Sequence, residues 1–197
     1  MKDTAYVAIF DRRGNLIDTL PILLGAVDSI RQFDACLLIP PNICVETTTY
    51  IDTITLLPQA GGYHLAYQRC CRNSTILNII DPLNTGSTYD LLLTEAAMLS
   101  GNNSPIKKIE PHTFVCVNRQ LVWDNSATDR EGDSLVYRLS TPLDGGISID
   151  NPRPRPALPP PYNEIVWNTP TYDLDNILGG MPLSINPKTG ILTGTPN

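Results

Sequence analysis

Proline is the residue that most restricts how this chain folds. Eighteen of its 197 residues are prolines, and they are spread along the whole sequence. A proline inside a helix removes a backbone hydrogen bond and clashes with the preceding turn, so long helices are not expected. Only the short run 94–101 (TEAAMLSG) has helical character.

Alternation of apolar and polar residues with a period of two predicts β-strands instead. Strand-like runs occur at 4–11 (TAYVAIFD), 47–57 (TTTYIDTITLL), 63–69 (YHLAYQR), 87–93 (STYDLLL) and 133–139 (DSLVYRL). Within 63–69, alternation places His64, Ala66 and Gln68 on one face, the more polar one. A hairpin is expected over 182–194, where two such runs flank an Asn-Pro-Lys-Thr-Gly turn.

Short strands separated by turn clusters predict an all-β fold of two tandem β-sandwich modules. The stretch 101–112 (GNNSPIKKIEPH) reads as the boundary, which divides the chain into modules 1–108 and 109–197. The proline-rich run 151–162 (NPRPRPALPPPY) cannot pair as a central strand. We expect it to be an extended loop of the second module, either a contact surface or an insertion.

Composition excludes some classes of partner. The formal net charge is -6 and the pI is about 4.8, whereas nucleic-acid binding needs a basic face. No run approaches the roughly 20 apolar residues of a membrane span, so membrane insertion is not expected. The N-terminus lacks the features of a signal peptide, and we interpret the chain as a piece of a longer secreted protein.

The chain contains five cysteines: Cys36, Cys44, Cys70, Cys71 and Cys116. Adjacent cysteines rarely bond each other, and neighbours on a strand point to opposite faces. We therefore expect Cys70 and Cys71 to form structural disulfides with two different partners, for which Cys36 and Cys44 are available. Each would stabilise the fold by roughly 2–4 kcal/mol. Metal or thiol chemistry is the alternative, but the sequence has neither paired C-x2-C knuckles nor a C-x-x-C motif.

Four acidic residues crowd the segment 124–133: Asp124, Asp129, Glu131 and Asp133. Calcium needs several oxygen ligands, and carboxylates at alternate positions converge where a glycine such as Gly132 lets the chain turn. This segment is a candidate calcium site. An acidic β-turn with solvated carboxylates is the alternative.

The sequence indicates no catalytic centre. It has two histidines, His64 and His112, and none of the nucleophile, metalloprotease or phosphate-binding motifs. Paired carboxylates for glycoside cleavage need not be close in sequence, but no segment suggests such a pair. Arg69 and Arg72, which flank the adjacent cysteines, could bind an acidic ligand, pair with local carboxylates or cover apolar surface.

Several segments occur in an order that resembles a known family: GGYHLAYQRCCRN, NNSP, FVCVN, SATDREGDSLVYRL and TPLDGG. They are similar to the large secreted surface proteins of Bacteroidota that are associated with gliding motility and type IX secretion. The resemblance covers roughly 36–197. The final stretch 179–197 resembles the end of an immunoglobulin-like (cadherin-like) module, and the acidic run resembles the opening of one.

This resemblance has consequences for the sites. Related cadherin-like modules bind calcium through acidic residues at module junctions, which supports the candidate calcium site. A cysteine often stands in the family where this chain has Ser140, and it would pair with the position of Cys116. The resemblance therefore implies that Cys116 is a buried free thiol.

We expect a non-catalytic structural or adhesive piece of a large secreted bacterial cell-surface protein, acting as a rigid spacer or a binding module. Its expected partners are neighbouring modules of the same chain and an extracellular glycan or protein. The alternative is a carbohydrate-binding module of a secreted polysaccharide-degrading protein.

Overall fold

The computed structural model describes residues 4–30, 45–108 and 115–197. Nearly all regular structure in these residues is β, which confirms the predicted all-β class. The single helix described is α1 (Glu95–Ser100), which Thr94 caps at its N-terminus and Gly101 ends with a φ of 71°. No described helix has the length and apolar character that crossing a bilayer requires.

The chain divides into two compact units, each built from three separate segments. Unit 1 comprises Met1–Asp28, Glu46–Asn102 and Pro142–Val166, and unit 2 comprises Ser29–Val45, Asn103–Thr141 and Trp167–Asn197. The break after Asn102 lies near the expected boundary. The segment Pro142–Val166, however, belongs to the first unit and not to the second, so two modules in simple tandem do not describe this division.

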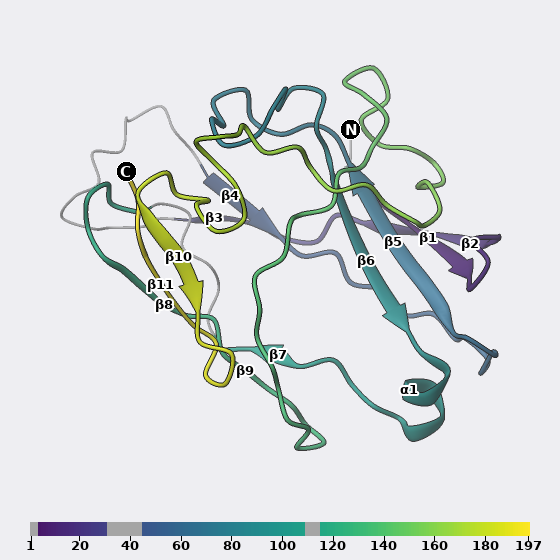
Figure 1. Ribbon diagram of the computed structural model, residues 1–197. Helices are drawn as coiled ribbons and strands as arrows, with labels where there is room; N and C mark the ends of the chain where they lie inside the picture. The colour runs from purple at the N-terminus through teal and green to yellow at the C-terminus, as the bar shows by residue number, and fades with distance from the viewer. Residues whose placement is uncertain (1–3, 31–44, 109–114) are drawn as a thin grey trace. The chain divides into compact units, whose positions relative to one another are not determined.

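Unit 1 contains a four-stranded antiparallel sheet in the order β2-β1-β5-β6 (Figure 1). The strands are β1 (Thr4–Asp11), β2 (Leu16–Leu23), β5 (Tyr63–Arg69) and β6 (Ser87–Leu93). Three of them coincide with the predicted runs 4–11, 63–69 and 87–93. Of the predicted run 47–57, only residues 47 and 48 lie in a strand, which is β4 (Val45–Thr48). Residues 49–57 are not in a strand.

The core of unit 1 lies between this sheet and the proline-rich segment. Ala8, Phe10 and Ala66 form a buried cluster with Ala157, and Tyr162 packs against it. Register explains the sheet half of the cluster, since Ala8 pairs with Ala66 on neighbouring strands and both point to the same face. The small alanine side chains let the segment approach closely. The expected loop is therefore a packed layer over the sheet.

Unit 2 contains a three-stranded antiparallel sheet in the order β10-β11-β8 (Figure 1). Its strands are β8 (Leu121–Asp124), β10 (Met181–Ile185) and β11 (Ile191–Thr195). The predicted hairpin is confirmed: the Asn186 side chain accepts the N–H groups of Lys188 and Thr189, and Gly190 has a φ of 74°. Two further strand pairs lie outside these two sheets. They are β3 (Val27–Ile30) with β4, and β7 (Ile106–Lys107) with β9 (Ala127–Thr128).

The predicted strand 133–139 does not form. Within this run, Tyr137 donates its N–H to the Pro187 carbonyl at 3.0 Å and accepts the Ala127 N–H at its hydroxyl at 2.9 Å. The Tyr137 ring lies against Gly190, where an added Cβ would come within 2.9 Å of it. The alternation in this run thus reflects side-chain packing without a strand ladder.

The packed layer makes a test possible. We expect Ala157→Glu to destabilise the protein by roughly 3–5 kcal/mol, because it buries a carboxylate that has no partner. Leu158→Glu is the matched control, since Leu158 is 46% exposed on the same segment and should change stability by about 0.5 kcal/mol or less. Urea denaturation of both variants measures the difference. Equal effects would contradict the placement of Ala157 in the core.

Candidate functional site

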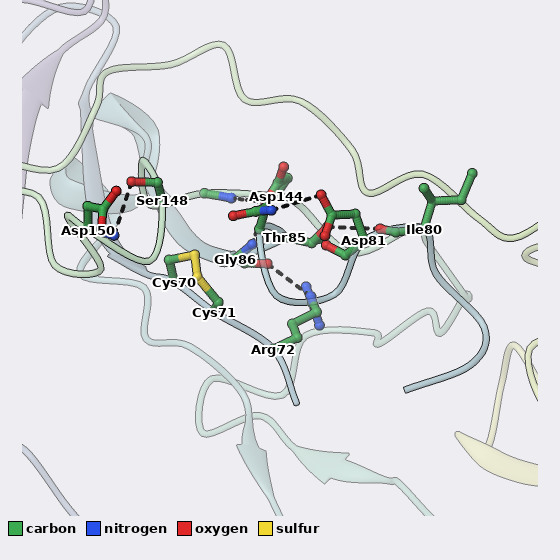
Figure 2. The surroundings of a disulfide bond; sticks show 12 residues. Cys70, Cys71, Arg72, Ile80, Asp81, Thr85, Gly86, Asp144, Ser148 and Asp150 are labelled. Atoms are coloured by element: carbon green, nitrogen blue, oxygen red, sulfur yellow. Dashed lines mark hydrogen bonds between the residues drawn. A yellow bond between two sulfur atoms is a disulfide. The ribbon is translucent and has the colours of Figure 1, made fainter. Parts of the chain in front are cut away.

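Cys70 and Cys71 form a disulfide with each other, with their Cα atoms 3.0 Å apart (Figure 2). The prediction that they bond two different partners is therefore wrong; Cys36 and Cys44 lie outside the described residues. The alternation of a strand does not apply here, because β5 ends at Arg69. Beyond that point the Cys70 N–H leaves the sheet and donates to the Pro152 carbonyl at 2.8 Å.

A pair of glycines makes room for this disulfide. Cys70 is 5% exposed, and a Cβ added to Gly146 would lie 2.7 Å from its backbone nitrogen. A Cβ on Gly145 would collide with the Thr88 hydroxyl oxygen. The Gly145–Gly146 turn therefore packs directly against the ends of β5 and β6, and larger residues would displace it.

Arg72 follows the disulfide and binds backbone carbonyls (Figure 2). Its Nε donates to the Gly86 carbonyl at 2.9 Å, and its N–H donates to the carbonyls of Thr85 at 2.9 Å and Pro82 at 3.1 Å. These bonds hold the loop before β6 in place. Among the described residues, Arg72 thus binds backbone carbonyls, a role that the sequence did not suggest.

Asp144 connects the glycine turn to the same loop. Asp144 lies beside Gly86 (Figure 2), and its Oδ1 accepts the Gly86 N–H at 2.6 Å. The same oxygen accepts the Gly145 N–H at 2.7 Å, and the Asp144 carbonyl accepts the Thr88 hydroxyl at 2.6 Å. Hydrogen bonds to a charged acceptor are the stronger kind. The bonds to Gly86 and Thr88 join positions more than fifty residues apart in the chain, so Asp144 is a principal link within unit 1.

Gln68 continues this network under the proline-rich segment. It is 4% exposed, its Nε2 donates to the Thr88 hydroxyl at 3.0 Å, and its Oε1 accepts the Leu158 N–H at 2.8 Å. Both ends of the buried amide are therefore satisfied, as buried polar groups require. Gln68 thus anchors the segment to β5.

A half-open cavity of about 160 Å³ lies beside this network. Its lining combines apolar residues, namely prolines, a leucine and a tyrosine, with the acidic residue Asp144 and two amide-bearing residues. The lining residues are Gln68, Asp144, Gly145, Gly146, Leu158, Pro159, Pro161, Tyr162 and Asn163. All of them belong to unit 1.

His64 and Tyr162 both lie near the carboxylate of Asp90. His64 Nδ1 is 2.9 Å from Asp90 Oδ2. The Tyr162 hydroxyl is buried without a hydrogen-bond partner among the described residues. Burial, and then the negative charge of Asp90, raise the pKa of Tyr162 above its usual range, so the phenol stays neutral. His64 therefore has a carboxylate partner in the sheet, while His112 lies outside the described residues.

The acidic turn in unit 2 is organised around Asp129. Its Oδ1 accepts the N–H groups of Glu131 at 2.9 Å and Asp133 at 3.0 Å. The Glu131 carboxylate in turn accepts the Asn103 side chain at 2.6 Å and its N–H at 3.2 Å. Each of these two carboxylates thus satisfies nearby N–H groups.

Asp124 stands apart from that turn, at the end of β8. Its Oδ1 accepts the Ser126 N–H at 2.9 Å, and interactions with the Ser126 side chain and then its backbone lower the pKa of Asp124. Within the described parts of the chain, no three acidic, histidine or cysteine residues are grouped to hold a metal ion. Calcium binding stays a prediction.

Cys116 is disulfide-bonded, so the implied free thiol is wrong. Its partner lies outside the described residues, since Cys70 and Cys71 bond each other. The expectation of an unpaired Cys116 depended on the resemblance, in which its partner stands where this chain has Ser140.

Comparison with known proteins adds no identification. No family model, curated protein or solved structure matches the chain. The resemblance to the gliding-associated surface proteins therefore stays a prediction.

Sequence reasoning missed the residues that build the cavity wall. Asp144, Gly145 and Gly146 belong to the run TPLDGG, whose Asp-Gly-Gly is a turn signal. That signal indicates a turn, but it does not indicate which strands the turn contacts.

The acidic turn leads to a prediction. Asp129→Ala should lower the melting temperature by a few degrees in calcium and in EDTA alike, because it leaves two backbone N–H groups without an acceptor, at about 1 kcal/mol. Asp133→Ala is the control, since the Asp133 carboxylate accepts no hydrogen bond from a described residue. Differential scanning calorimetry measures both variants. A calcium-dependent rise in the wild type that Asp133→Ala abolishes would instead establish the predicted calcium site.

Proposed function

We propose that this chain is a non-catalytic structural or adhesive part of a secreted bacterial cell-surface protein. One observation carries the proposal: the three cysteines in the described residues, Cys70, Cys71 and Cys116, are all disulfide-bonded. Disulfides persist in oxidising environments such as the cell exterior and are rare in the cytosol. Neighbouring modules and an extracellular glycan or protein are its proposed partners.

The way unit 1 is assembled supports a load-bearing role. Asp144 bonds the Gly86 N–H, and Gln68 bonds the Leu158 N–H, so the segment 142–166 is tied to strands that lie far away in sequence. Pulling or cleaving one part of such a unit does not release the rest, because each segment is held by the others. This suits a surface protein that is exposed to force and to proteases.

The proposed location can be tested in the source cells. Trypsin cleaves after Arg69 and Arg72, so Cys70 and Cys71 are released together in one tripeptide. When living cells are treated with an alkylating agent before lysis, we expect this tripeptide to carry no label and to be lighter by two hydrogens than its reduced form. Mass spectrometry with and without dithiothreitol distinguishes the two.

Alkylation of both Cys70 and Cys71 in cells that received no dithiothreitol would contradict the proposal, because it would place the chain in a reducing compartment. A larger cross-linked peptide would keep the location but contradict the pairing.

Carbohydrate binding is the second candidate function, and one observation favours it. The rings of Tyr67 and Tyr89 stack with centroids 6.1 Å apart and an interplanar angle of 27°. Tyr89 is 66% exposed. Exposed aromatic rings combine an apolar face with a polar edge, a surface on which pyranose rings stack.

Affinity electrophoresis in gels that contain polysaccharide tests this candidate. We expect Tyr89→Ala to lose the retardation of the wild type, because it removes the outer ring of the pair. Leu91→Ala is the control: Leu91 lies on the same strand and face and is 50% exposed. A wild type that migrates unretarded in every polysaccharide tested would count against the candidate.

A further inference from the structure

Among the described residues, the carboxylate of Asp144 in this cavity has no cationic partner. Asp144 Oδ1 is occupied by two backbone N–H groups, whereas no hydrogen bond or ion pair from a described residue reaches Oδ2. None of the lining residues that the structure describes is a lysine, arginine or histidine. A half-buried carboxylate in this position attracts a cation, since burial reduces the screening of its charge.

The remaining walls suit an aliphatic chain. Leu158, Pro159, Pro161 and Tyr162 are the apolar residues of the cavity lining. Lysine stems lie along apolar surface of this kind while their charged ends stay with polar groups, and a tyrosine ring attracts an ammonium group held over its face. The Asn163 side chain, whose amide makes no hydrogen bond to a described residue, adds a second polar group.

The size of the cavity agrees with such a ligand. Its volume is about 160 Å³, and a cavity of roughly 150 Å³ holds a six-carbon ring. Four methylenes and an ammonium group are similar in size to such a ring. A lysine side chain therefore fits, whereas an aromatic side chain would fill the cavity without using the carboxylate.

We propose that this cavity binds a primary ammonium group on an aliphatic chain, as a lysine side chain of a partner protein presents it. The identity of the partner as an extracellular protein rests on the proposed adhesive function; the preference for an ammonium group does not. Methylenes pack on the prolines and Tyr162, and the ammonium group donates to Asp144 Oδ2. The fixed bonds to Oδ1 keep the carboxylate in place before the ligand arrives.

Binding is measured by NMR titration of the isotope-labelled chain with two matched probes. One is N-acetyl-lysine methylamide, and the other is N-acetyl-norleucine methylamide, which has the same aliphatic chain without the ammonium group. We expect the lysine probe to shift the amide signals of Gly145 and Gly146 and to bind at least about tenfold more tightly than the norleucine probe. Its affinity should fall as the salt concentration rises.

Asp144→Asn is the informative variant, because its Oδ1 can still accept both N–H groups while Oδ2 is replaced by a donor. We expect it to weaken the lysine probe roughly tenfold. Asp150→Asn is the control: it removes the same charge from the same segment of unit 1, outside the cavity lining, and should leave binding unchanged.

Three results would overturn the inference: equal binding of the two probes, unchanged binding by Asp144→Asn, or signals that respond to free hexoses and not to the lysine probe. If Asp144→Asn does not fold, the comparison of the two probes on the wild-type chain still tests whether the cavity prefers an ammonium group. The alkylation experiment on living cells is independent of these binding measurements. A cavity that does not bind the lysine probe can therefore be distinguished from a wrong proposed location.

Discussion

Unit 1 depends on the packing of the segment 142–166 against the face formed by β1 and β5. Ala157 lies on Ala8 and Ala66, and the small side chains allow the backbones to approach closely. Without this layer the ring of Phe10 would face water, and the amide of Gln68 would lose the Leu158 N–H. Prolines suit the segment, because their restricted φ lowers the entropy that ordering costs.

The disulfide, the glycine turn and the cavity all follow from that contact. Once the segment crosses the sheet, residues 144–146 meet the ends of β5 and β6, where only glycine leaves room beside Cys70. The Asp144 carboxylate then bonds the Gly86 N–H and forms one wall of the cavity. The proposed lysine site is thus a product of the same layer that completes the core.

Prediction succeeded where the pattern is local. Period-two alternation located β1, β5 and β6, and turn chemistry located the hairpin around Asn186 and Gly190. It failed for 133–139, whose alternation is equally clear but whose residue Tyr137 bonds Pro187 and Ala127 outside any ladder. Alternation reports which side chains share a face, and a ladder needs in addition a neighbouring strand with free N–H and carbonyl groups.

By itself, the sequence determined the all-β class and most strands of the first sheet, because proline content and alternation act locally. Only the tertiary structure decided that Cys70 pairs with Cys71 and which face of β5 is covered. Alternation marks the face of His64, Ala66 and Gln68 as the polar one, yet Ala66 and Gln68 are buried beneath the proline-rich segment. Such contacts join residues about ninety positions apart, and no local pattern encodes which distant segment will lie on a strand.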